Sequence, residues 1–136
     1  MENRYLFRAK RIDNGEWTYG YLYGIWERKY ILWGMTNNVP DMTEVDPSTI
    51  CQYTGEKDKN GQKIFDGDIL EAHLDDSFPE DVTRVSVTFE NMKWCLVQKG
   101  MIPDPFEKGE WKYWEVIGNI FDNPELIGET KDGESR

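Results

Sequence analysis

The stretch RYLFRAKRIDNGEWTYGYLYGIW, residues 4–26, decides the fold because it reads as two strands joined by a tight turn. In its first part, apolar and basic residues alternate with a period of two, which is typical of a strand with one buried face. The Asn14-Gly15 pair then supplies the positive φ angles that a tight hairpin turn needs. We therefore predict an antiparallel hairpin at the start of the chain.

The returning strand of this hairpin, residues 17–26, is rich in aromatic side chains. Tyr19, Tyr21 and Tyr23 fall on one side of it, and Gly20 and Gly24 fall on the other. Glycines inside a strand permit a bend or a bulge. The pattern therefore predicts a bent hairpin with one strongly aromatic face.

The rest of the chain predicts further short strands separated by turns. A strand is expected at residues 30–33. Pro40 and Pro47 lack the backbone N–H of other residues, so we predict an ordered loop over residues 34–48. A single helical turn that begins at a proline is expected at residues 123–127. The other predicted strands cover residues 49–53, 69–74, 82–89, 94–97 and 111–120.

Short strands at this spacing favour a mainly β fold with little helix. We predict an N-terminal aromatic hairpin lobe with its loop over residues 1–48 and a small, strongly bent, SH3-like barrel over residues 49–127. Residues 128–136 lack apolar anchors and are expected to form a disordered tail. The structural turn glycines of this fold are Gly15, Gly61 and Gly67.

The composition describes an acidic chain of single-domain size. Its 136 residues carry 26 Asp and Glu against 16 Lys and Arg, a formal charge of −10 that opposes binding to phosphate backbones. The two cysteines form no Cys-x-x-Cys pair, and no apolar stretch has the length of a signal core or a membrane span. We expect a cytoplasmic protein with reduced thiols and no membrane association.

Two segments of the chain carry a family resemblance. They read CQYTGEKDKNGQKIFDGDIL at residues 51–70 and EVIGNIFDNPELI at residues 115–127. Together with the opening strand at residues 5–9, they resemble the YopX family of phage and prophage proteins. The resemblance implies a β-rich fold and an origin in a temperate phage or integrated element, hence a bacterial host cell, but it brings no established activity. An acidic insertion at residues 75–81 departs from the family's usual pattern.

Acidic side chains are the most tempting candidates for a metal site. The carboxylates of Asp66, Asp68 and Glu71 are the type of ligand that Mg²⁺ or Ca²⁺ prefers. However, Asp66-Gly67-Asp68 is also typical of a turn ahead of a strand, in which Asp bonds its own backbone. We favour the turn, and we predict no metal site and no cofactor.

Nucleophilic catalysis would have to be built around His73, the only histidine in the chain. Cys51 or Cys95 would then serve as the nucleophile, an arrangement that the sequence allows without suggesting. We therefore predict no catalytic residues and no enzyme.

The aromatic hairpin is the candidate functional surface. Two strands with so many aromatic side chains are not stable alone and must pack against the rest of the chain or against another copy. Self-association would hide apolar surface and cover edge strands, so we expect a homo-oligomer. The residues assigned to this surface are Tyr19, Tyr21, Tyr23, Trp26 and Tyr30.

The leading hypothesis for function is a non-catalytic accessory protein that binds a protein, either itself or a host factor. The alternative is a nucleic-acid role. Single strands could stack on the aromatics near Arg28 and Lys29, or on Trp111, Tyr113 and Trp114 near Lys108 and Lys112. The acidic surface could instead imitate DNA and occupy a host DNA-binding enzyme.

Overall fold

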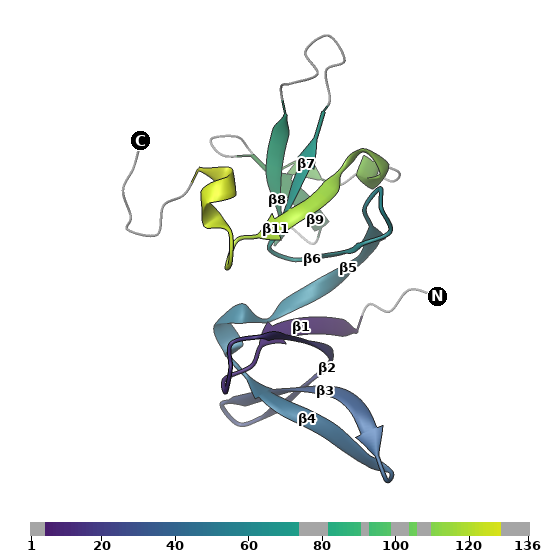
Figure 1. Ribbon diagram of the computed structural model, residues 1–136, viewed down its shortest axis with the longest axis vertical. Coiled ribbons are helices and arrows are strands. Elements are labelled where there is room, and N and C mark those ends of the chain that lie inside the picture. The colour runs from purple at the N-terminus through teal and green to yellow at the C-terminus, as the bar shows by residue number, and fades with distance from the viewer. Residues whose placement is uncertain (1–4, 74–81, 91–92, 99–103, 106–109, 129–136) are drawn as a thin grey trace. The chain divides into compact units, whose positions relative to one another are not determined.

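The computed structural model describes residues 5–73, 82–90, 93–98, 104–105 and 110–128 (Figure 1). The chain divides into two compact units, Met1–Gly55 and Glu56–Arg136. The described residues form two antiparallel sheets with three short 3₁₀ helices, which confirms the predicted mainly β class. The boundary between the units falls inside the strand β5, Cys51–Lys57, whereas the predicted lobe ends at residue 48.

The first sheet begins with the predicted hairpin. Residues Leu6 to Lys10 pair with Tyr21 to Trp17 in an antiparallel register, and Gly15 takes a φ of 74° in the turn between them. The strands follow the order β4-β3-β2-β1-β5-β6. Their bounds are β1 Leu6–Lys10, β2 Trp17–Ile25, β3 Arg28–Thr36, β4 Val39–Val45, β5 Cys51–Lys57 and β6 Lys63–Phe65.

The first four strands curl so that the end of β1 meets the end of β4. Arg11 forms an isolated antiparallel bridge with Val45. The N–H of Ile12 donates to the Glu44 carbonyl at 3.1 Å, and the N–H of Asp46 donates to the Lys10 carbonyl at 2.8 Å. Inside this curl lies a small core of Ala9, Ile31 and Val45, each fully buried, with Phe7 and Ile50 packed against it.

Gly20 is the residue that lets β2 take part in the curl. A Cβ placed on Gly20 would collide with the Leu32 carbonyl oxygen and would lie 2.8 Å from the carbonyl carbon. Gly24, four residues further along the same strand, would meet only the flexible side chain of Lys29. The backbone of β3 therefore approaches β2 closely at Gly20, where only glycine fits.

The predicted loop over residues 34–48 is wrong, because the end of β3 and the whole of β4 occupy most of it. Asn37 and Asn38 take φ angles of 53° and 66° and form the two-residue turn between β3 and β4, since asparagine tolerates the left-handed region. Pro40 is accommodated because β4 is the edge strand of its sheet. Proline excludes a central strand but not an edge strand, and this distinction was missed in the sequence.

The second sheet lies in the C-terminal unit and follows the order β10-β9-β8-β7-β11. Its core contains Ile64, Leu70, Ala72, Val85, Val87, Leu96 and Trp114, which are all buried. Among the described residues, the strand pairings do not close this sheet into a barrel. The strands are β7 Asp68–Ala72, β8 Thr83–Glu90, β9 Lys93–Val97, β10 Asp104–Pro105 and β11 Glu115–Asn119.

Helix is confined to single turns, as predicted. The 3₁₀ helices are η1 Pro47–Thr49, η2 Glu110–Tyr113 and η3 Pro124–Ile127, so the strand predicted over residues 111–120 begins only at Glu115. None of the helices in the described part is long and apolar enough to cross a membrane. The acidic insertion at 75–81 and all of the predicted tail except Gly128 lie outside the described residues.

We expect the Gly20→Ala variant to be strongly destabilised. Its methyl group would strike the β3 backbone, which cannot move without opening the curl, so the free energy of unfolding should fall by about 3 kcal/mol. The matched control is Gly24→Ala, whose methyl group meets only the Lys29 side chain and should change stability by less than about 1 kcal/mol. Urea unfolding measures both, and equal losses would show that the close approach at Gly20 is unimportant.

Candidate functional site

A row of apolar side chains crosses four strands of the N-terminal sheet on one face. The register pairs Leu6 with Tyr21, Tyr21 with Leu32, and Leu32 with Met42. Directly paired residues in antiparallel strands project from the same face, so these four side chains form one continuous row. Tyr21 is 51% exposed and Met42 is 47% exposed, while Leu6 and Leu32 are half-buried.

Tyrosines extend this row on both sides. Tyr19 pairs with Arg8, and Tyr23 pairs with Tyr30, so all of them share the face with Tyr21. Tyr19 and Tyr23 are exposed and Tyr30 is half-buried, and the rings of Tyr23 and Tyr30 lie 6.5 Å apart between centroids. We call this surface the tyrosine face, which consists of Leu6, Tyr19, Tyr21, Tyr23, Tyr30, Leu32 and Met42.

The structure brings four of the five predicted surface residues together on this face. The fifth, Trp26, lies instead in the turn between β2 and β3, where it takes a φ of 56° and is 91% exposed. Leu6, Leu32 and Met42 were missed in the sequence. The Asn37-Asn38 pair was the signal for Met42, because it marks the turn that starts β4.

Basic side chains border the tyrosine face at two places. The guanidinium of Arg8 lies 4.6 Å from the ring centroid of Trp17, and the ammonium of Lys10 lies 5.4 Å from it. At the other end of β2, the pKa of Arg28 is raised by its hydrogen bond with the Tyr30 side chain and by the nearby Glu44 carboxylate. The cations therefore lie at the border of the face and are engaged with aromatic or acidic neighbours.

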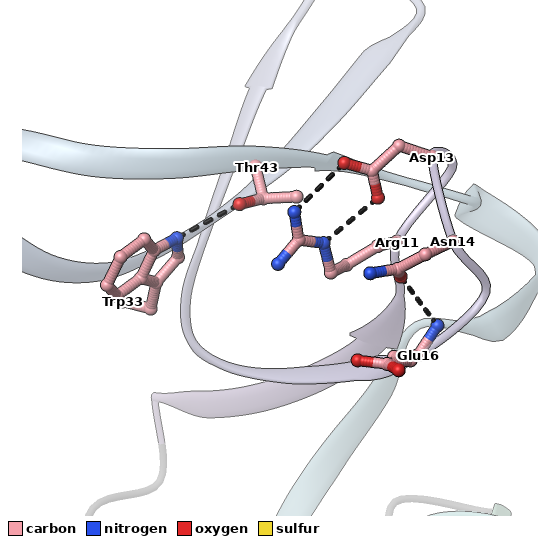
Figure 2. A network of polar contacts seen from close by, with 6 residues as sticks. All are labelled: Arg11, Asp13, Asn14, Glu16, Trp33 and Thr43. Atoms are coloured by element: carbon pink, nitrogen blue, oxygen red, sulfur yellow. Dashed lines mark hydrogen bonds and ion pairs between the residues drawn. The ribbon is translucent and has the colours of Figure 1, made fainter.

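The first hairpin turn is held by its own polar side chains (Figure 2). Arg11 donates two hydrogen bonds to the Asp13 carboxylate, at 3.0 and 2.9 Å, and this guanidinium lowers the pKa of Asp13. The Asn14 side-chain oxygen accepts a hydrogen bond from the N–H of Glu16 at 2.9 Å. Nearby, the indole N–H of Trp33 donates to the Thr43 hydroxyl at 3.0 Å and joins β3 to β4. These contacts are exposed and local, so they account for the geometry of the turn and of the β3–β4 pair.

The predicted turn at Asp66-Gly67-Asp68 explains the acidic residues there. Asp68 is almost fully buried, and its carboxylate accepts a hydrogen bond from the N–H of Phe65 at 2.7 Å. Gly67 has a φ of 85°, donates its N–H to the Val87 carbonyl and accepts from the N–H of Ile120. Within the described residues, no group of three or more His, Cys, Asp or Glu side chains is placed to hold a metal ion. Asp68 and Gly67 therefore organise the backbone of this turn.

A second buried carboxylate, Asp58, was not singled out in the sequence. One of its oxygens accepts from the N–H groups of Asn60 and Gln62, at 2.8 and 2.9 Å, and the other accepts from the N–H of Val116 at 2.8 Å. Asp58 therefore closes the turn that contains Gly61 and ties this turn to β11.

The remaining sequence candidates are not assembled into a site. His73 lies just beyond β7 and is exposed, although the strand predicted over residues 69–74 includes it. Cys51 and Cys95 are buried, and their thiols donate to the carbonyls of Thr49 and Lys93. Both thiols thus have a packing role here, and neither presents an exposed nucleophile.

The second aromatic cluster near Lys112 is divided between surface and core. Tyr113 is exposed, with the Lys112 ammonium 5.3 Å from its ring centroid. Trp114 is 3% exposed and belongs to the core of the C-terminal unit. These residues therefore do not form one stacking surface.

The C-terminal unit also has an open hollow of about 440 Å³. Arg84, the charged residue among the described residues that line it, donates to the Glu71 carboxylate at 2.9 Å and to the Leu126 carbonyl at 3.3 Å. This guanidinium thus links β7, β8 and η3. The lining residues are Val82, Arg84, Gln98, Leu126 and Ile127.

The described residues define a mainly β protein built from two antiparallel sheets. The model of the family described as "YopX protein" matches residues 6–128. Because this match covers nearly the whole chain, the protein belongs to the YopX family, as the sequence resemblance predicted. No curated protein matches the chain.

A solved structure has the same fold. It is the crystal structure of protein EF1440 from Enterococcus faecalis, with 21% sequence identity and a TM-score of 0.57. The match covers 89% of this chain and 96% of that chain. At this identity the likeness describes the fold alone.

The motifs that carry the family resemblance coincide with turns. Besides the turns at Asp58 and Gly67, the oxygen of the Asn119 side chain accepts from the N–H groups of Phe121 and Asp122, both at 2.9 Å. A Cβ on Gly118 would lie 2.8 Å from the side-chain carbon Cγ of Asn123, so this close approach requires glycine. The residues that carry the resemblance therefore have a structural role in these turns.

We expect Asp58→Asn to destabilise the C-terminal unit. An amide can keep one accepting oxygen, but its NH₂ group cannot accept from the Val116 N–H, which leaves a donor facing a donor. The free energy of unfolding should fall by about 2 kcal/mol, and by about 3 kcal/mol in Asp58→Ala.

The control for this pair is Asp122→Asn, at an exposed position where the change should cost less than about 0.5 kcal/mol. Denaturant unfolding compares the three variants. If Asp58→Asn were as stable as the unchanged protein, the carboxylate would not be what holds this turn.

Proposed function

We propose that this protein is a non-catalytic binding protein that acts through its tyrosine face. The supporting observation is the continuous row of Leu6, Tyr21, Leu32 and Met42, in which Tyr21 and Met42 are exposed and which is flanked by further tyrosines. Tyrosine presents a large rigid ring together with a polar hydroxyl. It therefore suits a surface that is exposed to water in the free protein and buried in a complex. The partner class is a protein, either a second copy or a host factor.

The polar chemistry of the described residues supports a non-catalytic role. The carboxylates of Asp58 and Asp68 bind backbone N–H groups, and the thiols of Cys51 and Cys95 donate to carbonyls. Such groups serve the fold and are costly to release for chemistry. Membership of the YopX family supports the further proposal that the protein is a phage or prophage accessory protein in the cytoplasm of a bacterial host.

A second candidate function is the stacking of single-stranded nucleic acid on the same face. It is favoured by Lys10 and Arg28, which stand at the border of the exposed tyrosines. The formal charge of −10 opposes it. Acidic mimicry of DNA is a variant of this candidate, in which a basic host enzyme is held in a salt-sensitive manner.

We expect the double variant Tyr21→Ser with Tyr23→Ser to lose the protein partner. Removing two half-exposed rings from the middle of the face should weaken binding at least about tenfold. The measurement is capture of the same partner from host lysate or from a second tagged copy of this chain, at equal folded content by circular dichroism.

The matched control is Tyr113→Ser, which removes an equally exposed tyrosine from the C-terminal unit and should leave capture intact. Partner capture that survives the double variant would remove the tyrosine face from the function. Retention of a labelled oligonucleotide with quenching of Trp fluorescence would favour the stacking candidate instead.

We also expect no response to divalent cations. Because the Asp68 carboxylate is bound to the backbone, Mg²⁺, Mn²⁺ or Ca²⁺ at millimolar concentration should leave the melting temperature unchanged. A rise of several degrees with one of these ions, lost in Asp66→Asn, would contradict the non-catalytic assignment.

A further inference from the structure

We propose that a second copy of this chain covers the tyrosine face, so that two N-terminal sheets pack face to face about a two-fold axis. This inference rests on the proposed function and names the partner that covers the tyrosine face. Three features of the described residues support it: the apolar area of the face, the charge of the unit that carries it, and the state of the neighbouring sheet edge.

The area of the tyrosine face matches the apolar centre of a stable interface. Tyr19, Tyr21 and Tyr23 are each close to half exposed, which amounts to roughly 100 Å² for each ring. With the methionine and the half-buried members, the face presents on the order of 500 Å² of mainly apolar surface, as large as the largest patch of a typical monomer. A standard interface buries about 800 Å² on each partner, with an apolar centre and a polar rim.

Charge distribution favours a second copy over a charged partner. The first 55 residues hold six Lys and Arg against seven Asp and Glu, a formal charge of −1, so the remaining residues carry −9 of the chain's −10. A nucleic acid would need a clearly basic face, and a basic protein would be drawn to the acidic unit. Two nearly neutral N-terminal units, in contrast, can meet without strong repulsion.

The rim of the face has charges of both signs. Arg28 pairs with Ile25 and therefore projects from this face, and Glu44 projects from it opposite Tyr30. A two-fold axis places the same residues of both copies in one interface. Each copy can then offer its cation and its carboxylate to the rim of the other.

The sheet edge next to the face is poorly suited to pairing. β4 is an edge strand, but Pro40 lacks an N–H, and Glu44 and Val45 are already engaged by Ile12 and Arg11 at the other end of the strand. Association through the edge is therefore disfavoured relative to association through the face. Because a face-to-face contact uses the same surface on both copies, it closes at two copies and does not propagate.

The test uses charge at Met42 and compares it with Val39 on the same strand. Val39 is 61% exposed and lies three residues away, on the opposite face of β4. In light scattering on a sizing column, the unchanged protein should have twice the 16.0 kDa mass of one chain. Met42→Glu and Met42→Lys should each raise the dimer dissociation constant at least about tenfold, because each copy would bury a charge in the apolar interface. Val39→Glu should leave it unchanged.

Mixing the Met42→Glu and Met42→Lys proteins supplies the decisive measurement, because it restores opposite charges across the interface without restoring the methionine. We expect the mixture to form more dimer than either variant forms alone, because opposite charges across one interface attract where like charges repel, a result that a folding defect in either variant could not produce. The proposal would be overturned if the unchanged protein were a monomer, or if substitutions at Met42 and Val39 changed the dimer dissociation constant equally.

The outcomes also separate this inference from the proposed function. A monomer whose capture of a host protein is lost in the Tyr21 and Tyr23 double variant would overturn the second copy and retain the binding function. A monomer that captures no protein would overturn both. Retention of an oligonucleotide by the monomer would overturn the second copy in favour of stacking.

Discussion

The closure of the N-terminal sheet on itself is the constraint on which the rest of this unit depends. Because Arg11 bridges to Val45 while Gly20 admits the β3 backbone, the four strands enclose a small core of Ala9, Ile31 and Val45, with Phe7 and Ile50 packed against it. The alternation along β2 puts Gly20 on the side where the β3 backbone approaches closely, and it puts Tyr19, Tyr21 and Tyr23 on the opposite, exposed side. The exposed aromatic surface therefore follows from the alternation that gives the crowded side of β2 to a glycine.

In the C-terminal unit, two buried carboxylates stabilise turns of the backbone through hydrogen bonds. Asp58 and Asp68 are removed from water, which would be costly if they were not bound to backbone N–H groups. Each one closes a turn next to a glycine with positive φ, Gly61 or Gly67, so the turn and the strand that follows it are set together. This explains how the YopX motifs can define a lineage without defining an activity.

Much of this fold could be predicted from the sequence, and the failures have physical causes. The hairpin from Leu6 to Ile25 was predictable because alternation and the Asn-Gly turn act locally. β4 was missed because Pro40 excludes only a central strand, and the position of a strand within a sheet depends on pairings that no local pattern reveals. The tyrosines of the site could be predicted, but Leu6 and Leu32 could not, since they join the face only through the cross-strand register, and Met42 could be found only through the Asn37-Asn38 turn that starts β4.

Net charge averaged over a chain can conceal the surface that matters. A formal charge of −10 describes an acidic protein, yet nearly all of it belongs to the residues after Gly55, and the tyrosine face stands in a unit close to neutrality. Exposed Leu or Phe at the same positions would promote indiscriminate association. Tyrosine keeps its hydroxyl solvated in the free chain and still offers most of a ring for burial. A face of tyrosines is thus a surface that tolerates water when it is free and suits the apolar partner that we propose, while nearly all of the formal charge lies in the residues after Gly55.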